Sequence, residues 1–288
     1  MQEISKATSL SDASGEEIIE SREYLPKPLF AIDFKPTAKL AQFSLEMRNV
    51  VGALQEQTDS VGKHGVNILS GFHDAPLSAE SGVWSFFADF TKADVEPEAL
   101  ATELSSHRSV LRVRCKRSND GFITDTMQFP VLVGKERAII VRASILVSVL
   151  QRIKAIFGPE SRSAQVILHQ IGEAGAERVF ESVRTMTGPD FIRNNVGRAL
   201  SLFTAVGWGI LEVKAVNLDA KTAEIHIRDG FESADSRNAS TTVQCHFTRG
   251  MLTGWLSQLF ERKIEVTETQ CIAKGDPACI FLAKPNQH

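Results

Sequence analysis

Residues 268–285 have the sequence ETQCIAKGDPACIFLAKP, which places two of the chain's four cysteines eight positions apart. Gly275, Asp276 and Pro277 lie between Cys271 and Cys279, and these residue types are typical of a tight turn. The pattern predicts two short strands whose thiols face each other across that turn. A metal site, a redox pair and a plain hairpin are all compatible with this stretch alone.

A metal site would need further ligands close to the hairpin. Glu268 precedes Cys271 by three residues, a spacing that alternates faces in a regular strand, so both can bind one ion only where the strand bulges or bends. Cys245 offers another thiolate, and zinc takes cysteine, histidine and sometimes carboxylate ligands. Each residue also has a structural explanation, because free cysteines are often buried core residues and Glu268 fits an exposed strand position.

The composition is that of an ordinary globular chain, with 43% hydrophobic residues, 23% charged residues and a net charge of −3. Its 288 residues are enough for two domains. The charge balance lacks the basic face that nucleic-acid binding requires, so we expect no direct nucleic-acid partner. The polar N-terminus and the absence of a long apolar run predict a cytoplasmic location away from the membrane, where thiols stay reduced.

The first part of the chain predicts a small α+β domain after a flexible tail at residues 1–27. Apolar periodicity and turn residues indicate the order β-α-β-β-α-β, the ferredoxin-like plan, over residues 28–118. The predicted elements are a strand at 26–34, a helix at 37–57, strands at 65–74 and 82–91, a helix at 97–107 and a strand at 109–117. Cys115, on the last of these strands, is expected to be a core residue.

After a linker at 119–137, residues 138–284 predict a second α+β domain, with helices packed on an antiparallel sheet. We expect helices at 138–157, 161–186, 188–207 and 248–260, and strands at 207–219, 222–233, 262–273 and 278–284. Phosphate-binding glycine loops and the H-E-x-x-H and G-x-S-x-G motifs do not occur in the sequence. We therefore expect a protein that is not an enzyme.

Residues 243–285, VQCHFTRGMLTGWLSQLFERKIEVTETQCIAKGDPACIFLAKP, resemble the C-terminal core of the 4-vinyl-reductase-type (4VR) domain. HQIGEAGAERVFESV (169–183) resembles the helix that opens that fold, so the likeness covers about residues 135–284. In family members that sense aromatic compounds, three cysteines and a glutamate bind zinc. The resemblance implies a closed, structural Zn²⁺ site at Cys245, Glu268, Cys271 and Cys279, with His246 as a competing ligand.

Residues 28–118 resemble an ACT domain in element order and in KHGVNILS (63–70), which opens the second strand. The resemblance implies a regulatory module that pairs through its sheet and often binds an amino acid. Ligand-binding members usually carry a glycine after the first strand, whereas this chain has KPTAKL (35–40). A dimerising module without a ligand and an amino-acid sensor both remain open.

The 4VR resemblance also implies an apolar small-molecule pocket beside the metal hairpin. The candidate ligand-binding residues are Phe203, Trp208, Ile225, His226, His246 and Phe247, although the aromatic ones also suit a core. We expect a homodimeric regulatory protein that senses a small hydrophobic or aromatic effector. A tetrapyrrole-related reductase or accessory factor and a non-catalytic scaffold are the alternatives.

Overall fold

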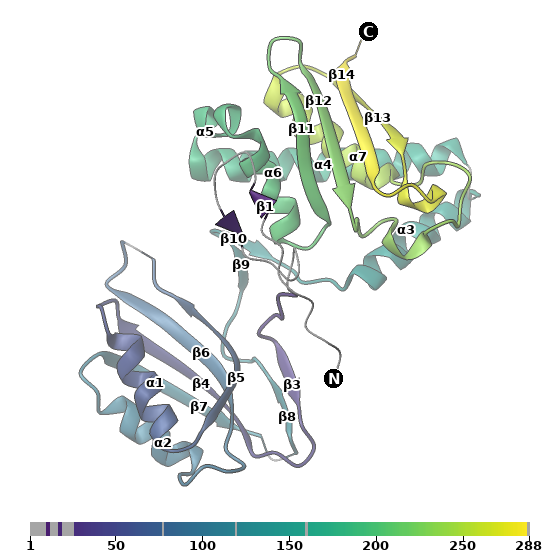
Figure 1. Cartoon of the computed structure of the whole chain (residues 1–288). Helices are drawn as coiled ribbons and strands as arrows, with labels where there is room; N and C mark the ends of the chain where they lie inside the picture. Colours follow the sequence, from purple (N-terminus) through teal and green to yellow (C-terminus); the bar gives the residue numbers. More distant parts are fainter. Residues whose placement is uncertain are drawn as a thin grey trace. The chain divides into compact units, whose positions relative to one another are not determined.

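The computed structural model describes residues 10–11, 17–18, 26–76, 78–118, 120–158 and 161–286. The chain divides into two compact units, residues 1–130 and 131–288, each built from helices and antiparallel sheet (Figure 1). The predicted α+β class is confirmed. Most of the predicted tail lies outside the described residues, apart from a pair of two-residue strands, β1 (Leu10–Ser11) and β2 (Glu17–Ile18).

The first unit is built on a four-stranded antiparallel sheet in the order β5-β6-β4-β7. Its elements are β4 (Leu40–Arg48), α1 (Ala53–Lys63), β5 (Asn67–Asp74), β6 (Ser81–Asp89), α2 (Pro97–Ser105) and β7 (Val110–Arg117). A smaller pair, β3 (Ile32–Phe34) and β8 (Phe122–Thr124), accompanies it. Phe43, Phe86 and Leu100 belong to the buried core, against which the half-buried Cys115 packs.

The prediction of a helix over residues 37–57 is wrong. Residues 40–48 form the central strand β4, paired with β6 on one side and β7 on the other, and the helix begins only at Ala53. Apolar residues at 40, 43 and 47 match helical spacing, but a strand covered on both faces shows no strict alternation. Gln42 and Leu45 are both fully buried although they lie on opposite faces, which hides the period of two.

The second unit carries the antiparallel sheet β11-β12-β14-β13, with helices packed against it. The hairpin β9 (Val131–Val133) and β10 (Glu136–Ala138) comes first, followed by α3 (Ala143–Phe157), α4 (Arg162–Thr187), α5 (Pro189–Asn194) and α6 (Val196–Ala205). Then come β11 (Ile210–Asn217), β12 (Thr222–Arg228), the 3-10 turn η1 (Ala234–Ser236), α7 (His246–Phe260), β13 (Ile264–Gln270), η2 (Ile272–Lys274) and β14 (Cys279–Pro285). None of the helices in the described ranges is long and apolar enough to cross a membrane.

The single helix predicted over 188–207 is two helices, which are separated at Asn195 by a non-helical backbone (φ −138°, ψ 48°). Likewise, the helix predicted from residue 138 begins at Ala143, because residues 136–138 form strand β10. The other predicted elements of this unit agree with the structure to within a few residues at their ends.

Helices α4 and α7 pack with their backbones in unusually close approach. A Cβ added to Gly250 would lie 2.0 Å from the carbonyl oxygen of His169, and one added to Gly254 would lie 2.3 Å from that of Glu173. On the facing helix, a Cβ at Gly172 would lie 2.2 Å from the carbonyl oxygen of Phe247. Only glycine fits at these three positions, so they set the distance between the two helices.

Replacing Gly250 by alanine should therefore destabilise the second unit by about 3 kcal/mol, because the added methyl group meets backbone that cannot move away. Gly197 is the matched control, since a Cβ there meets nothing within 4 Å. Gly197→Ala in helix α6 should be neutral or stabilising by about 0.5–1 kcal/mol. Urea unfolding followed by the fluorescence of Trp255 on α7 measures both changes, and equal effects would contradict the packing argument.

In the first unit, His64 joins the end of α1 to two carboxylates. Its Nε2 lies 2.9 Å from Glu103 Oε2 on α2, and its Nδ1 lies 2.8 Å from Asp94 Oδ1. Hydrogen bonds to Glu103 and then to Asp94 raise the pKa of His64 above its ordinary value of 6.5. The imidazolium is thus favoured in the folded state.

Because the folded pKa is raised, this contribution to stability is fully present below the unfolded pKa and is lost as pH rises through the folded pKa. We expect the first unit to lose stability as the pH rises above about 6.5, and His64→Gln to remove that slope. The indole signal of Trp84, the tryptophan of this unit, reports its unfolding by NMR. An unchanged slope in the variant would show that other groups produce it.

Candidate functional site

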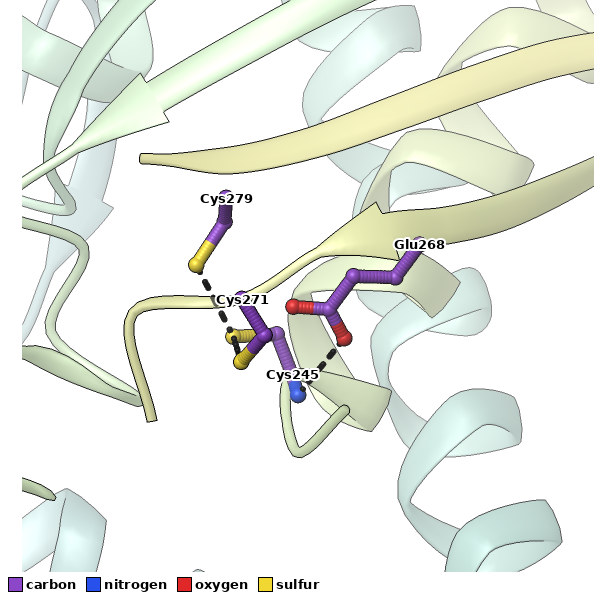
Figure 2. Close-up of side chains that lie close together, drawn as sticks. All are labelled: Cys245, Glu268, Cys271 and Cys279. Atoms are coloured by element: carbon purple, nitrogen blue, oxygen red, sulfur yellow. Dashed lines mark hydrogen bonds between the residues drawn. The ribbon is translucent and has the colours of Figure 1, made fainter. Parts of the chain in front are cut away.

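Three segments of the second unit bring the four predicted metal ligands together. Cys245 is the residue before α7, Glu268 lies on β13, Cys271 follows that strand, and Cys279 begins β14. Figure 2 shows the four side chains converging, and one ligand atom from each lies within 4.8 Å of all the others. All four residues are buried, so the cluster is closed to solvent.

The bulge that the spacing of Glu268 and Cys271 required is present in the structure. The pairing of β13 with β14 shifts register between Glu268 and Gln270, which turns the glutamate and the following cysteine to the same side. Beyond it, the N–H of Cys271 donates to Asp276 Oδ2 (2.8 Å), closing the predicted turn. Gly275 adopts a φ of 98°, the left-handed conformation that glycine tolerates.

The distances within the cluster fit a tetrahedral metal. Cys245 Sγ lies 3.8 Å from Cys271 Sγ and 3.6 Å from Cys279 Sγ. With a Zn–S bond of about 2.3 Å, the edge of a tetrahedron is about 3.8 Å. Glu268 Oε2 accepts a hydrogen bond from the N–H of Cys245 (3.0 Å), while its buried Oε1 has no partner among the described residues. The donor set therefore fits zinc, with Oε1 available as the fourth ligand.

The protonation of the cluster favours a cation at its centre. Hydrogen bonds from the Cys245 and then the Cys279 thiols hold the pKa of Cys271 far below its ordinary range. Burial, followed by the charge of Cys271, raises the pKa of Glu268 to about 8. The pKa of Cys245 is also raised, first by its hydrogen bonds to Cys271 and Cys279 and then by burial. One thiolate thus holds the protons of its neighbours, and a bound metal would displace them.

Polar groups around the cluster orient its ligands. The N–H of Ile272 donates to Cys279 Sγ (3.4 Å), and Ser233 Oγ lies 3.3 Å from the same sulfur. Such partners fix the direction of a ligating sulfur and stabilise its charge.

Glu232 is a buried residue of this region that the sequence did not reveal. Its carboxylate accepts hydrogen bonds from the N–H groups of Phe247 (3.1 Å) and Thr248 (2.8 Å), in the first turn of α7. Glu232 thereby caps the helix from outside it. Burial raises the pKa of this carboxyl, and the bonds from Thr248 partly offset that effect. It precedes α7 by more than ten residues, so no capping pattern in the sequence marks it.

A group of aromatic rings lies against the other side of the first turns of α7. The ring centroid of Trp208 is 5.6 Å from that of Phe203, 5.5 Å from that of Phe231 and 5.8 Å from that of Phe247. The rings border a cavity of about 20 Å³, which is room for about one water molecule. Its lining residues are Phe203, Trp208, Gly209, Leu211, Ile227, Phe231, Thr248, Met251 and Leu252.

The predicted ligand-binding residues divide into two groups. Phe203 and Trp208 line the cavity, and Phe247 touches Trp208 behind it. Ile225 is buried in the core of this unit without lining the cavity. His226 does not line it either, because strand alternation turns this residue away from the face of Ile225, and its Nε2 lies 2.7 Å from Glu224 Oε1. The expectation that His226 anchors a ligand in this cavity is therefore corrected.

His246 also lies outside the cavity lining, on the side of the cysteine cluster. It is buried, and its Nδ1 has no hydrogen-bond partner within the part of the chain that the structure describes. Burial, followed by the charges of Lys154 and Arg249, lowers its pKa to about 4, so the ring is neutral at pH 7.

Residues 224–285 match the vinyl-4-reductase family model, so the C-terminal region of this chain contains a 4VR domain. The uncharacterized protein MJ0150 of Methanocaldococcus jannaschii is 38% identical over 76 residues, which are 26% of this chain and 42% of that protein. The uncharacterized protein MJ1460 of the same organism is 25% identical over 121 residues, 42% of this chain and 74% of that protein. The match thus spans less than half the length of the first relative.

Among solved structures, the phenol-responsive sensory domain of the transcription activator PoxR with phenol is similar to this chain. The TM-score is 0.47 at 23% sequence identity, and the match covers 54% of this chain and 80% of that domain.

Purified protein should carry one zinc ion per chain by native mass spectrometry. Cys271→Ser should lose the metal and lower the Tm by about 10 °C or more, because metal binding is coupled to folding. Cys115→Ser, which changes the half-buried thiol of the first unit, is the control and should keep the zinc. A natural protein that is free of zinc and melts at the same temperature with and without a chelator would contradict a structural site.

Proposed function

We propose that this protein is a non-enzymatic regulator that senses a small hydrophobic or aromatic molecule in the cavity of its 4VR domain. The observation that carries the proposal is the apolar lining, in which Thr248 supplies the polar side chain. The Thr248 hydroxyl donates to Glu232 Oε2 (2.8 Å), so its oxygen lone pairs remain available to accept a hydrogen bond from a ligand hydroxyl.

The small size of the cavity makes ligand binding a conformational event. About 20 Å³ does not hold an aromatic ring, so an effector has to displace Trp208 or Phe231. Phe231 is followed by Glu232, which caps α7, and α7 begins next to Cys245. A ligand that binds the open arrangement better than the closed one would therefore shift the position of this segment.

In this proposal the metal is zinc, and its role is structural. A site with three thiolates and one carboxylate from the protein leaves no open coordination position for a substrate. The ion would tie β13, β14 and the start of α7 together and so keep one wall of the cavity in place. The proposal places the protein in the cytoplasm, where the reduced thiols suit this ligand set.

We further propose that the first unit is an ACT-like, ferredoxin-type module that pairs two chains. Support comes from its element order, strand-helix-strand-strand-helix-strand, and from the sheet order β5-β6-β4-β7.

Phenol and toluene, tested on the full chain, should raise the Tm of the natural protein by preferential binding to the folded state. At a concentration 100 times the Kd, the stabilisation is about 2.7 kcal/mol. Leu211→Trp fills the cavity from β11 and should abolish the shift, whereas Val213→Trp, two residues along the same strand and outside the lining, should keep it. Differential scanning calorimetry measures each case. The proposal fails if neither compound shifts the natural protein, or if Leu211→Trp responds as the natural protein does.

A further inference from the structure

A second hollow of the 4VR domain lies on the other side of α7 from the aromatic cavity. It is a groove of about 700 Å³ between α4, α7 and β13. The residues that line it are Val166, His169, Gln170, Glu173, Ala174, Glu177, Arg249, Thr253, Ser257, Lys263, Ile264, Glu265, Val266, Thr267 and Asn286. The groove shares no lining residue with the cavity of the proposed function, so it is a separate candidate site.

One wall of the groove is the free edge of a sheet. Strand β13 ends the sheet, with β14 on one side and no described strand on the other. The N–H of Ile264 donates to Ser257 Oγ (3.1 Å) on α7, away from β14, while the carbonyl of Lys263 accepts from Asn286 on the opposite side. Because backbone groups alternate along a strand, the N–H and C=O of Val266 also point away from β14, towards the groove.

The dimensions of the groove match a short extended peptide. On α4 the lining runs from Val166 to Glu177, a rise of about 16 Å at 1.5 Å per residue. About five residues of an extended chain cover that length, at about 3.3 Å each. The floor is a row on α7, Arg249, Thr253 and Ser257, at a spacing of four residues. A chain lying here can pair with β13 and contact α4 on its other side.

The charges of the walls indicate which side chains such a peptide would carry. The α4 wall presents the carboxylates of Glu173 and Glu177 and contains no lysine or arginine. His169 adds no positive charge at pH 7, because burial and then the nearby Arg249 lower its pKa. The cations of the groove, Arg249 and Lys263, lie on α7 and at the start of β13. Side chains that face α4 would therefore meet negative charge only.

We propose that this groove binds an extended segment of about five residues from a partner protein, which adds a strand to β13 and directs lysine or arginine side chains towards Glu173 and Glu177. Pairing with the backbone of Val266 provides affinity, and the two carboxylates select basic residues at alternate positions. The 4VR domain would then hold an effector on one side of α7 and a partner segment on the other.

A fluorescein-labelled peptide of alternating lysine and valine, six residues long, tests the proposal with the full chain by fluorescence anisotropy. We expect saturable binding with a Kd of about 10 to 100 µM. Ala174→Trp, an exposed substitution inside the groove, should abolish it. Ile171→Trp, an equally exposed position of α4 outside the groove, should leave it unchanged. The double variant Glu173→Lys, Glu177→Lys should weaken it at least about tenfold.

Two further peptides separate strand addition from simple charge attraction. The same peptide with N-methyl groups on alternate backbone nitrogens keeps its charge but loses hydrogen-bond donors, and it should not bind. A peptide of alternating glutamate and valine should bind at least about tenfold more weakly. Absence of saturable binding below about 1 mM, equal binding of the N-methylated peptide, or an unchanged Kd in Ala174→Trp would each overturn the proposal. Phenol binding to the same variants is measured independently, so the two sites can fail separately.

Discussion

The close packing of α7 against α4 is the constraint on which the 4VR domain depends. Gly172, Gly250 and Gly254 let the two backbones approach within contact distance, so neither the spacing nor the rotation of α7 can change without a clash. That fixed helix then serves three places. Its start lies beside Cys245 and the cysteine cluster, one face borders the aromatic cavity, and another forms the floor of the groove along β13.

The start of α7 is also where the chain concentrates electrostatic cost. Three thiols and Glu268 lie buried within a few ångströms of one another, with the buried Glu232 on the first turn of the helix. Burial raises the pKa of both carboxyl groups, which means that their charges are poorly solvated. A divalent cation offsets that cost and joins elements more than twenty residues apart in sequence. The cluster and the helix cap therefore hold the same point of the fold from two sides.

Much of the second unit and its cluster could be predicted from the sequence because its signals are local. Glycine, aspartate and proline between Cys271 and Cys279 mark a turn, and the three-residue step from Glu268 to Cys271 requires the bulge that the register shift displays. In the first unit the same kind of reasoning failed over residues 37–57. A central strand buried on both faces has no alternation, and its apolar positions matched helical spacing by chance.

The sequence by itself determined the α+β class, most element positions of the 4VR domain and the four residues of the cluster, because turn chemistry and ligand type are properties of short segments. Tertiary structure alone decided that Glu232 caps α7, that His226 faces away from the cavity while Phe231 and Leu252 line it, and that β13 remains an open edge beside α4. These features depend on which distant segments meet, and contacts between segments far apart in the chain leave no pattern within either one.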